Sequence, residues 1–362
     1  MKYPLKTRQI ALFFIAFLPT IKFFMLPSVL AKTANEDMWI SALINLILDA
    51  VTLSVILIAC KRYKCDFYTL LECRFGKTIA KITFLLYFVY FLLKSILPII
   101  EQKDYIETTL YITMPSNLYF VPFFLLAFFI SCKNLKVIAR LSDVLWIVTL
   151  IGVTIILVMS ISNVDLTNLF PFFANGPKKI VSGSYYALSW FGDCAYALFF
   201  IGKFKWEEKS RLKITLGYVI GAVTVILFMI FFYCVFTSIA FREQFALTEI
   251  TKYTTVINNT GRFDYVGIMM LIFSDMFSAV LPYYFAVHVL KKVFTPQKKW
   301  ILPLIVACIL IVITVLLTEF THSIEQFSVV HAGWFYLIMA NVLPIALCLI
   351  PPKEKLNEEY QY

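Results

Sequence analysis

Long apolar runs separated by short polar segments dominate the hydropathy pattern of the chain. Ten runs are long enough to cross a bilayer core, which takes about 20 helical residues. Their apolar positions are continuous rather than alternating, so they predict helices and not the strands of a barrel. The runs cover residues 9–31, 39–59, 79–100, 117–131, 142–162, 184–203, 213–237, 263–290, 300–318 and 332–350. We therefore expect an all-α integral membrane protein with a single transmembrane domain, residues 1–352, and a cytoplasmic tail, residues 353–362.

The composition supports lipid as the main solvent of the chain. Hydrophobic residues make up 61% and charged residues 15%, against about half and about a quarter in soluble domains. The sequence contains no GxSxG, HExxH, P-loop or GxGxxG motif, so we expect no enzyme and no cofactor. The eight cysteines form no close CxxC pair, which argues against a disulfide framework and a zinc site.

Lysine and arginine follow a regular topological pattern. If the N-terminus is cytoplasmic, 23 of these residues lie on the cytoplasmic side and seven on the other side. Every loop fits this alternation, which supports ten crossings and places both termini in the cytoplasm. The pattern also explains the net charge of +10 as topology and attraction to anionic lipid. Nucleic acid is therefore not an expected partner.

Five charged residues fall inside the apolar runs, where charge is costly and marks candidate functional positions. Asp49, Asp193 and Asp275 come close to the bilayer midplane, and Lys22 lies in the outer half. Lys94 lies nearer the outer surface, where its long side chain could snorkel to the headgroups. Snorkelling is also the alternative for Lys22, and a purely structural ion pair is the alternative for Asp193 and Asp275.

Two runs contain signals that break helices. Pro19 and Pro27 bracket Lys22, and proline removes an amide donor and clashes with the preceding turn. The sixth run carries Gly192 between polar residues at mid-span. Broken helices leave free amides and carbonyls that bind charged ligands, although an ordinary kink remains the alternative. The ligand-binding candidates are Pro19, Thr20, Ile21, Lys22, Ser189, Trp190, Phe191, Gly192 and Asp193, and the further pocket or coupling charges are Asp49, Lys94 and Asp275.

The positions of the breaks and charges suggest an internal symmetry. The first and sixth runs would correspond in a five-plus-five inverted repeat, and so would the third and eighth. Lys22 and Asp193 lie on the first corresponding pair, and Lys94 and Asp275 on the second. Inverted repeats with broken first helices are typical of one large transporter architecture. The sequence itself shows no visible repeat.

Several short motifs together resemble one protein family. The set is ordered along the chain: Glu36–Ser41, Tyr68–Glu72 with Phe75–Lys77, Thr113–Pro115, Asn134–Arg140, Leu169–Pro171 with Asn175–Gly176, and Phe191–Asp193. In this order they resemble the spore-germination permeases, the GerAB-like B subunits of nutrient germinant receptors in the amino acid–polyamine–organocation superfamily. Two features depart from that pattern. The glycine-rich break of the first helix is replaced by Pro19–Lys22, and Asp193 stands where glutamate is common.

The resemblance implies ten helices, a five-plus-five repeat and a ligand pocket between helices one, three, six and eight. It also implies assembly with receptor A and C subunits in the inner membrane of a spore. The main hypothesis is a germinant sensor for an amino acid or similar small nutrient, whose carboxylate meets Lys22 or free amides at the breaks and whose ammonium meets Asp193 and the carbonyls of the broken helices. The alternatives are a proton-coupled amino acid transporter with Asp193 or Asp275 as carrier, and a structural scaffold without a ligand.

Overall fold

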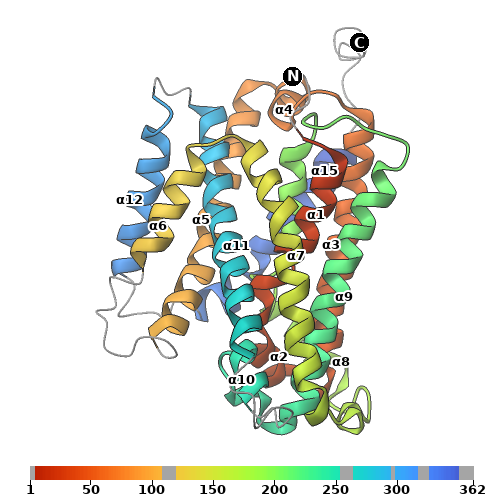
Figure 1. The fold of residues 1–362 in the computed structure, drawn as a ribbon. Coiled ribbons are helices and arrows are strands. Elements are labelled where there is room, and N and C mark those ends of the chain that lie inside the picture. The colour runs from red at the N-terminus through yellow and green to blue at the C-terminus, as the bar shows by residue number, and fades with distance from the viewer. Residues whose placement is uncertain (1–4, 108–119, 253–263, 295–297, 317–325, 350–362) are drawn as a thin grey trace.

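A computed structural model describes residues 5–107, 120–252, 264–294, 298–316 and 326–349. Within these ranges the regular structure is helical, apart from one isolated bridge between Leu5 and Phe204. Most of the helices run side by side along one axis (Figure 1). The start of α1, α4 and α15 lie at one end of the bundle, and α2, α8 and α10 lie at the other. We call the first end the basic end, because it carries Lys61, Arg62, Lys133, Lys203 and Lys292.

The helices have the following bounds. They are α1 Thr7–Phe17, α2 Leu26–Ala34, α3 Met38–Arg62, α4 Phe67–Phe75, α5 Lys77–Tyr105, α6 Phe120–Ser131, α7 Leu135–Ser160, α8 Gly176–Tyr186, α9 Ser210–Phe236, α10 Ala246–Lys252, α11 Asp264–Val293, α12 Ile301–Leu316, α14 Gly333–Leu337 and α15 Leu343–Leu349. Two 3-10 helices, η1 Thr20–Phe23 and η7 Asp193–Phe200, interrupt this series at its centre. Two π-helical turns, Phe327–His331 and Ile338–Val342, flank α14.

Length and composition identify the membrane-crossing elements. Five helical stretches are long and apolar enough to cross a bilayer: 26–62, 77–105, 135–163, 210–242 and 265–293. Shorter apolar helices cover 120–131, 301–315 and 333–349. Large apolar side chains such as Leu125 and Val158 stay exposed on the outside of the bundle, where lipid would cover them. The all-α membrane fold is confirmed, while ten crossings and the five-plus-five repeat stay predictions.

Several predicted boundaries are wrong. α7 begins at Leu135 and not at 142, and α5 continues to Tyr105 beyond the predicted end at 100. Hydropathy marks the depth of the hydrocarbon, whereas backbone hydrogen bonding continues past it through good helix formers such as Glu101 and Gln102. Parts of the predicted runs 117–131, 263–290, 300–318 and 332–350 lie outside the described residues, as do Thr113–Pro115 and the predicted tail 353–362.

The first helix is broken where the prolines predicted it. α1 ends at Phe17, a 3-10 turn covers Thr20–Phe23, and α2 begins at Leu26. Pro27 occupies the first turn of α2, a position where a missing amide costs nothing. The predicted break between Leu18 and Phe24 is therefore confirmed.

The sixth helix is also broken, but it begins earlier than predicted. Its first half is α8, which starts at Gly176 and not at 184, and its second half is the 3-10 helix η7. Gly192 joins them in the left-handed region, with φ of 86°. A Cβ at Gly192 would come within 2.6 Å of the Cβ of Ala340, so both the backbone angle and the packing require glycine.

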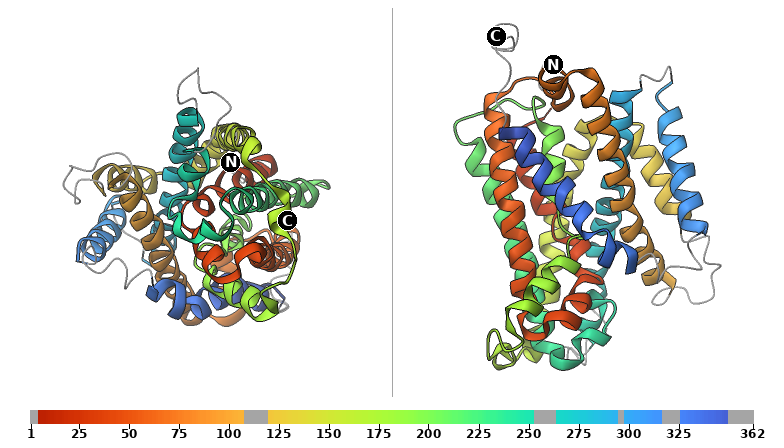
Figure 2. Two further views of the ribbon diagram at one scale, coloured as in Figure 1. Left: turned by 90° about the horizontal axis from the view of Figure 1, so that it is seen from below. Right: turned by 180° about the vertical axis from the view of Figure 1, so that it is seen from behind.

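The broken helices form the centre of the bundle. All eight residues of η7 are buried, as is most of α1. α1 packs against α7 and α9, while α11 packs against α5 and η1. Figure 2 shows α6 and α12 at the margin, away from this centre. The polar groups freed by both breaks thus lie in the interior, with unbroken helices between them and lipid.

Candidate functional site

Two lysines bracket one aspartate between the breaks. Lys22 Nζ lies 2.5 Å from Asp193 Oδ2 and donates to the Leu18 carbonyl over 2.7 Å. Lys94 Nζ, from α5, lies 3.4 Å from Asp193 Oδ1 and donates to the Phe191 carbonyl. Each carboxylate oxygen of Asp193 therefore faces its own ammonium group.

The carbonyls in this arrangement are those that the breaks release. Leu18 is the C-cap of α1, so its carbonyl lies at the partially negative end of that half-helix. Phe191 belongs to the irregular stretch between α8 and η7. Both lysine ammonium groups therefore sit in oxygen-rich positions made by a break carbonyl and the Asp193 carboxylate, the kind of setting that stabilises a buried cation.

Asp49 accepts hydrogen bonds from donor groups at the break of the sixth helix. Its Oδ2 accepts the Gly192 amide hydrogen over 2.9 Å, and its Oδ1 lies 3.3 Å from the Cys194 thiol, which donates. Tyr90 donates its hydroxyl to the Gly192 carbonyl over 3.3 Å. Asp49 on α3 and Tyr90 on α5 thereby fix the backbone at the break of the sixth helix.

The four charges balance and are shielded from solvent. Lys22, Lys94, Asp49 and Asp193 together carry no formal net charge, and the Lys22 and Asp193 side chains are 1% and 9% exposed. Buried charges are tolerated when they are paired and hydrogen-bonded, as they are here. Snorkelling is therefore wrong for both Lys22 and Lys94, because their ammonium groups point into the protein.

Asp275 stands apart from this cluster. Its Oδ2 accepts from the Gln102 amide over 2.9 Å, and its buried Oδ1 has no hydrogen-bond partner among the described residues. Lys94 pairs with Asp193 and not with Asp275, so the two residues that an inverted repeat would relate do not meet. Asp275 is a separate buried carboxyl group on α11.

The remaining candidates surround the cluster in different ways. Thr20 shares a hydrogen bond of 2.6 Å with Ser278, and the Ser189 hydroxyl is buried without a partner among the described residues. Ile21 lines a small cavity beside Asp193 of about 10 Å³, room for roughly one water molecule. Pro19 precedes the 3-10 turn as its N-cap. The site is thus closed in this conformation and has no space for an amino acid beside Asp193.

Trp190 reveals a residue that the sequence analysis missed. Its indole donates to Glu101 Oε1 over 2.7 Å, and Glu101 is buried. Glu101 follows directly after the predicted run 79–100, so it is not among the five charged residues that the sequence analysis places inside the apolar runs. A glutamate at the first polar position after an apolar run was the available signal. Asn341, whose side-chain oxygen accepts a hydrogen bond of 2.8 Å from Thr52, was missed as well, because only charged residues inside the apolar runs were taken as candidates.

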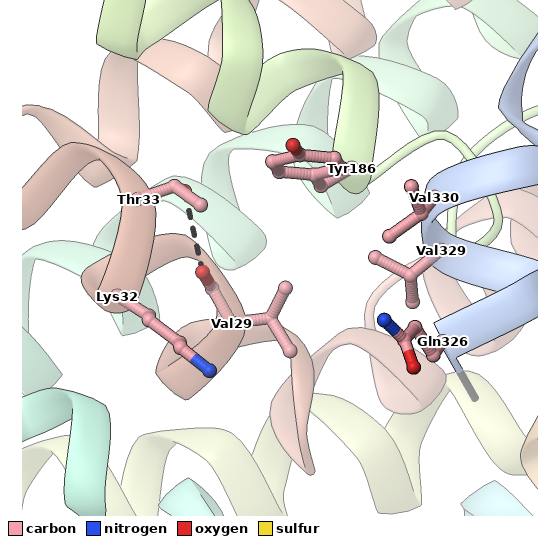
Figure 3. Close-up of a pocket in the computed structure, with 7 residues that line it drawn as sticks. All are labelled: Val29, Lys32, Thr33, Tyr186, Gln326, Val329 and Val330. Atoms are coloured by element: carbon pink, nitrogen blue, oxygen red, sulfur yellow. Dashed lines mark hydrogen bonds between the residues drawn. The ribbon is translucent and has the colours of Figure 1, made fainter. Parts of the chain in front are cut away.

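A larger pocket (Figure 3) lies against α2 and α8, the helices at the end opposite the basic end (Figure 1). Its volume is about 400 Å³, within the range of small-molecule sites. It lies between α2, α8 and the π-helical turn, and is lined by Val29, Lys32, Thr33, Tyr186, Gln326, Val329 and Val330. None of the predicted site residues lines it. Sequence reasoning missed it because its walls come from helix faces beyond the breaks.

The described part of the chain contains no group of three or more His, Cys, Asp or Glu side chains that could hold a metal ion. The charged groups at the breaks are the Lys22 and Lys94 ammonium groups and the Asp49 and Asp193 carboxylates. Such a cluster can exchange its internal ion pairs for pairs with a charged ligand.

Comparison with known families and structures decides the kind of protein. A family model described as spore germination protein matches residues 4–323. The chain belongs to the spore germination permease family. No curated protein sequence matches it. The membership agrees with the ordered motifs and with a multi-pass membrane protein.

Solved structures show the fold of this family member. A histidine-to-alanine mutant of the Eremococcus coleocola manganese transporter superposes with a TM-score of 0.63 at 12% identity, covering 94% of this chain and 78% of that one. A glutamate-to-alanine mutant gives 0.64 at 11% identity with the same coverage. The same transporter with an aromatic bis-isothiourea substituted compound gives 0.59 at 11% identity, again covering 94% and 78%. The chain thus has the fold of a membrane transporter.

Proposed function

We propose that this spore permease is the membrane subunit of a nutrient germinant receptor. In this proposal it binds an amino acid or a similar small nutrient at the two helix breaks and so triggers germination. Family membership and the transporter fold support a membrane permease or germination role. The site between the breaks supplies the reason to favour sensing.

The observation that carries the proposal is the bracketing of Asp193 by Lys22 and Lys94. In ion-driven transporters, broken helices offer carboxylates and carbonyls to cations that arrive and leave. Here two ammonium groups already occupy such oxygens, and both are tethered to the chain. A tethered ammonium group cannot travel with a substrate as a sodium or other metal cation does. The bundle is therefore suited to changing shape on binding without carrying a coupled metal ion.

An amino acid matches the charges of the cluster. Its carboxylate would take the Lys22 ammonium, and its ammonium would take Asp193 together with the Leu18 and Phe191 carbonyls. The cavity of about 10 Å³ beside Asp193 is too small for it, so the halves of the broken helices must move apart on binding. The nutrient would then favour the opened conformation by its differential affinity for that state.

In this proposal, the larger pocket between α2, α8 and the π-helical turn is the route by which the nutrient reaches this site. At about 400 Å³ it accommodates a small nutrient, and it touches the half-helices α2 and α8 that end at the two breaks. A ligand that enters there would reach the ion-pair cluster when those half-helices shift. In this proposal the pocket is an antechamber, and Lys32 at its wall attracts the carboxylate of the nutrient.

The wider setting of the proposal comes from the family resemblance. The chain would assemble with receptor A and C subunits in the inner membrane of the spore. The distribution of lysine and arginine supports cytoplasmic termini and puts the basic end inside. Movement of the broken helices would then be read by the partner subunits.

Spores test this proposal. Dipicolinate release is measured from spores lacking the gene and from complemented spores, against a panel of amino acids, sugars and nucleosides. We expect loss of the response to one nutrient class and its return on complementation. An unchanged response to every nutrient would remove the receptor role for this chain.

One observation favours a second candidate, a proton-coupled amino acid transporter. Asp275 is buried on α11 and keeps one carboxylate oxygen without a hydrogen-bond partner among the described residues. Ionisable residues at membrane depth serve as proton carriers in pumps and transporters. Measurement of flux in proteoliposomes separates the two candidates.

A further inference from the structure

A second polar cavity lies at the basic end, away from the helix breaks. Its volume is about 200 Å³, and it is lined by the end of α6, the turn between α6 and α7, and the C-terminal part of α11 from Tyr284 to Lys292. α11 packs against both α6 and α7, so the cavity is built into the bundle. Lys133, Asn134, His288, Lys291 and Lys292 contribute to its lining.

The cavity has an excess of positive charge. Lys291 donates to the Ser131 carbonyl over 2.7 Å, and Lys133 lies 4.7 Å from the centre of the Phe129 ring. Neither ammonium group pairs with a carboxylate in the described part of the chain. Lys292 contacts Asp66, but that carboxylate is shared with Lys203, 3.4 Å away. The cavity therefore keeps at least two uncompensated cations.

The backbone adds to this charge. α7 is 26 residues long and begins at Leu135, a residue that lines the cavity. Its N-cap, Asn134, makes no side-chain capping hydrogen bond, and its first turn has no acidic residue. The partially positive end of a helix, with free amide groups, attracts anions. Lysine ammonium groups and this helix end thus converge on one enclosed space.

We propose that this cavity binds a phosphate group presented by the headgroup of an anionic lipid. Phosphate matches the cationic lining, and basic cavities between helices at the inner face of a membrane are suited to lipid headgroups. The neighbouring Phe129 and Phe294 side chains are 60% and 55% exposed, which places a lipid-facing surface beside the lysines. A volume of about 200 Å³ holds a phosphate with its immediate substituent.

The cavity is linked to the broken sixth helix through Lys292. Asp66 joins Lys292 on α11 to Lys203, which follows the end of η7. A phosphate that takes up Lys292 competes with Asp66 and loosens this connection. A bound lipid would therefore make it easier for the second half of the sixth helix, η7, to move.

The test uses the purified full chain in nanodiscs. Retention of phosphatidylglycerol against phosphatidylcholine is measured by native mass spectrometry for the wild type and for the Lys133→Gln/Lys291→Gln double variant. Lys205→Gln is the matched control, because it removes one exposed charge at the same end outside the cavity. We expect the double variant to bind phosphatidylglycerol at least about tenfold more weakly, since even one hydrogen bond to a charged group contributes about 1.5–3 kcal/mol. Lys205→Gln should retain nearly all of the affinity.

A second arm identifies the source of the phosphate. Inorganic phosphate is added to the detergent-solubilised chain, and thermal stability is followed. Competition between inorganic phosphate and phosphatidylglycerol supports one shared phosphate site filled by lipid. Stabilisation by inorganic phosphate without any lipid preference overturns the lipid assignment.

The charge-conserving Lys291→Arg variant protects the test against a folding defect. It should bind phosphatidylglycerol like the wild type, and Lys133→Gln alone changes an exposed side chain that the fold tolerates. Equal loss of lipid in Lys133→Gln and Lys205→Gln would show general surface attraction and would overturn the proposal. No preference for the anionic lipid in the wild type would do the same.

Discussion

Asp193 is the residue on which the site depends, because both broken helices contribute to its surroundings. It forms ion pairs with Lys22 of the first helix and Lys94 of α5, and it is the first residue of η7, the second half of the sixth helix. A change in any of these contacts moves a charge that is buried away from bulk solvent. Electrostatic contributions are large in such surroundings, and removal of one partner costs more than the pair contributes.

Replacement of Lys22 tests the ligand role at this scale. In Lys22→Met spores, we expect the nutrient concentration for half-maximal dipicolinate release to rise by at least about tenfold, since a hydrogen bond to a charged group contributes about 1.5–3 kcal/mol. Immunoblotting of the spore membrane checks that the chain is present.

A charge-balanced variant separates binding from folding. Lys22→Met alone leaves an excess negative charge in the core and should cost about 3–5 kcal/mol of stability. Lys22→Met/Asp193→Asn leaves Lys94 and Asp49 as the two buried charges and should regain much of that stability, measured as the unfolding temperature in detergent. Its nutrient response should stay impaired. A normal dose response in either variant would refute a ligand role for Lys22.

Gly192 offers a test with an internal reference. It has φ of 86° and a Cβ would meet Ala340 at 2.6 Å, whereas Gly76 has φ of 87° and open space around it. The two φ angles are alike, but Gly76 has ψ of 164°, a region essentially closed to other residues, whereas Gly192 has ψ of 21° in the left-handed helical region. Backbone strain alone, of order 1–3 kcal/mol at each position, would make Gly76→Ala the costlier change. We expect Gly192→Ala to lower the unfolding temperature further, because only this change also disrupts packing. Equal shifts would mean that the contact with Ala340 is easily relaxed.

The first half of the first broken helix, α1, packs closely against α9. A Cβ at Gly217 on α9 would lie 2.3 Å from the Ala11 carbonyl of α1, and one at Gly221 would lie 2.8 Å from the Phe14 carbonyl. Backbones that approach this closely pack by small residues, as is common between membrane helices. α9 therefore fixes α1, and the motion proposed for nutrient binding belongs to α2 and to the break.

Gly217→Ala measures this contact between elements. The added methyl group must push α9 away from α1, and overpacking of this kind costs about 1–3 kcal/mol. We expect a lower unfolding temperature in detergent, whereas Val219→Ala, at a position 45% exposed on the same helix, should change it little. A shift no larger than that of Val219→Ala would indicate that the two helices separate without cost.

Asp66 organises the basic end of the whole molecule. Burial by itself raises the pKa of this carboxyl group, but hydrogen bonds from Lys292 and Thr69 outweigh it and hold the pKa well below its ordinary value. A carboxyl group with a lowered pKa contributes stability that is present above the ordinary value of about 3.9 and is lost as the pH falls toward the lowered pKa.

The expected pH dependence follows from that sign. Between pH 7 and pH 3 the unfolding temperature of the wild type should fall more steeply than that of Asp66→Asn, because the variant has no carboxylate to protonate there. Glu208→Gln, a change at an exposed position of the same end, should keep the slope of the wild type. Parallel curves for the wild type and Asp66→Asn would show that Asp66 does not link α4 to α11.

The sequence predicted local features of this molecule better than contacts. Proline and glycine signalled both breaks, because those residues act on their own backbone. Hydropathy found Asp193 and Lys94 at membrane depth but gave no partner, so Lys94 was compared with Asp275 and not joined to Asp193. The sequence could not predict the pocket of about 400 Å³, since its walls combine α2, α8 and a π-helical turn, and hydrophobic periodicity does not indicate which of these elements meet.

Flux in proteoliposomes tests whether the whole molecule moves a solute. Proteoliposomes containing the chain are given the radiolabelled nutrient under an inward proton gradient. We expect no accumulation above protein-free liposomes, because in the proposed receptor the nutrient moves the broken helices without being released on the other side of the membrane. Thermal stabilisation by the same nutrient shows that the reconstituted chain still binds. Accumulation that a proton ionophore abolishes would instead establish the transporter, and its loss in Asp275→Asn but not in Gln102→Ala would name Asp275 as the carrier.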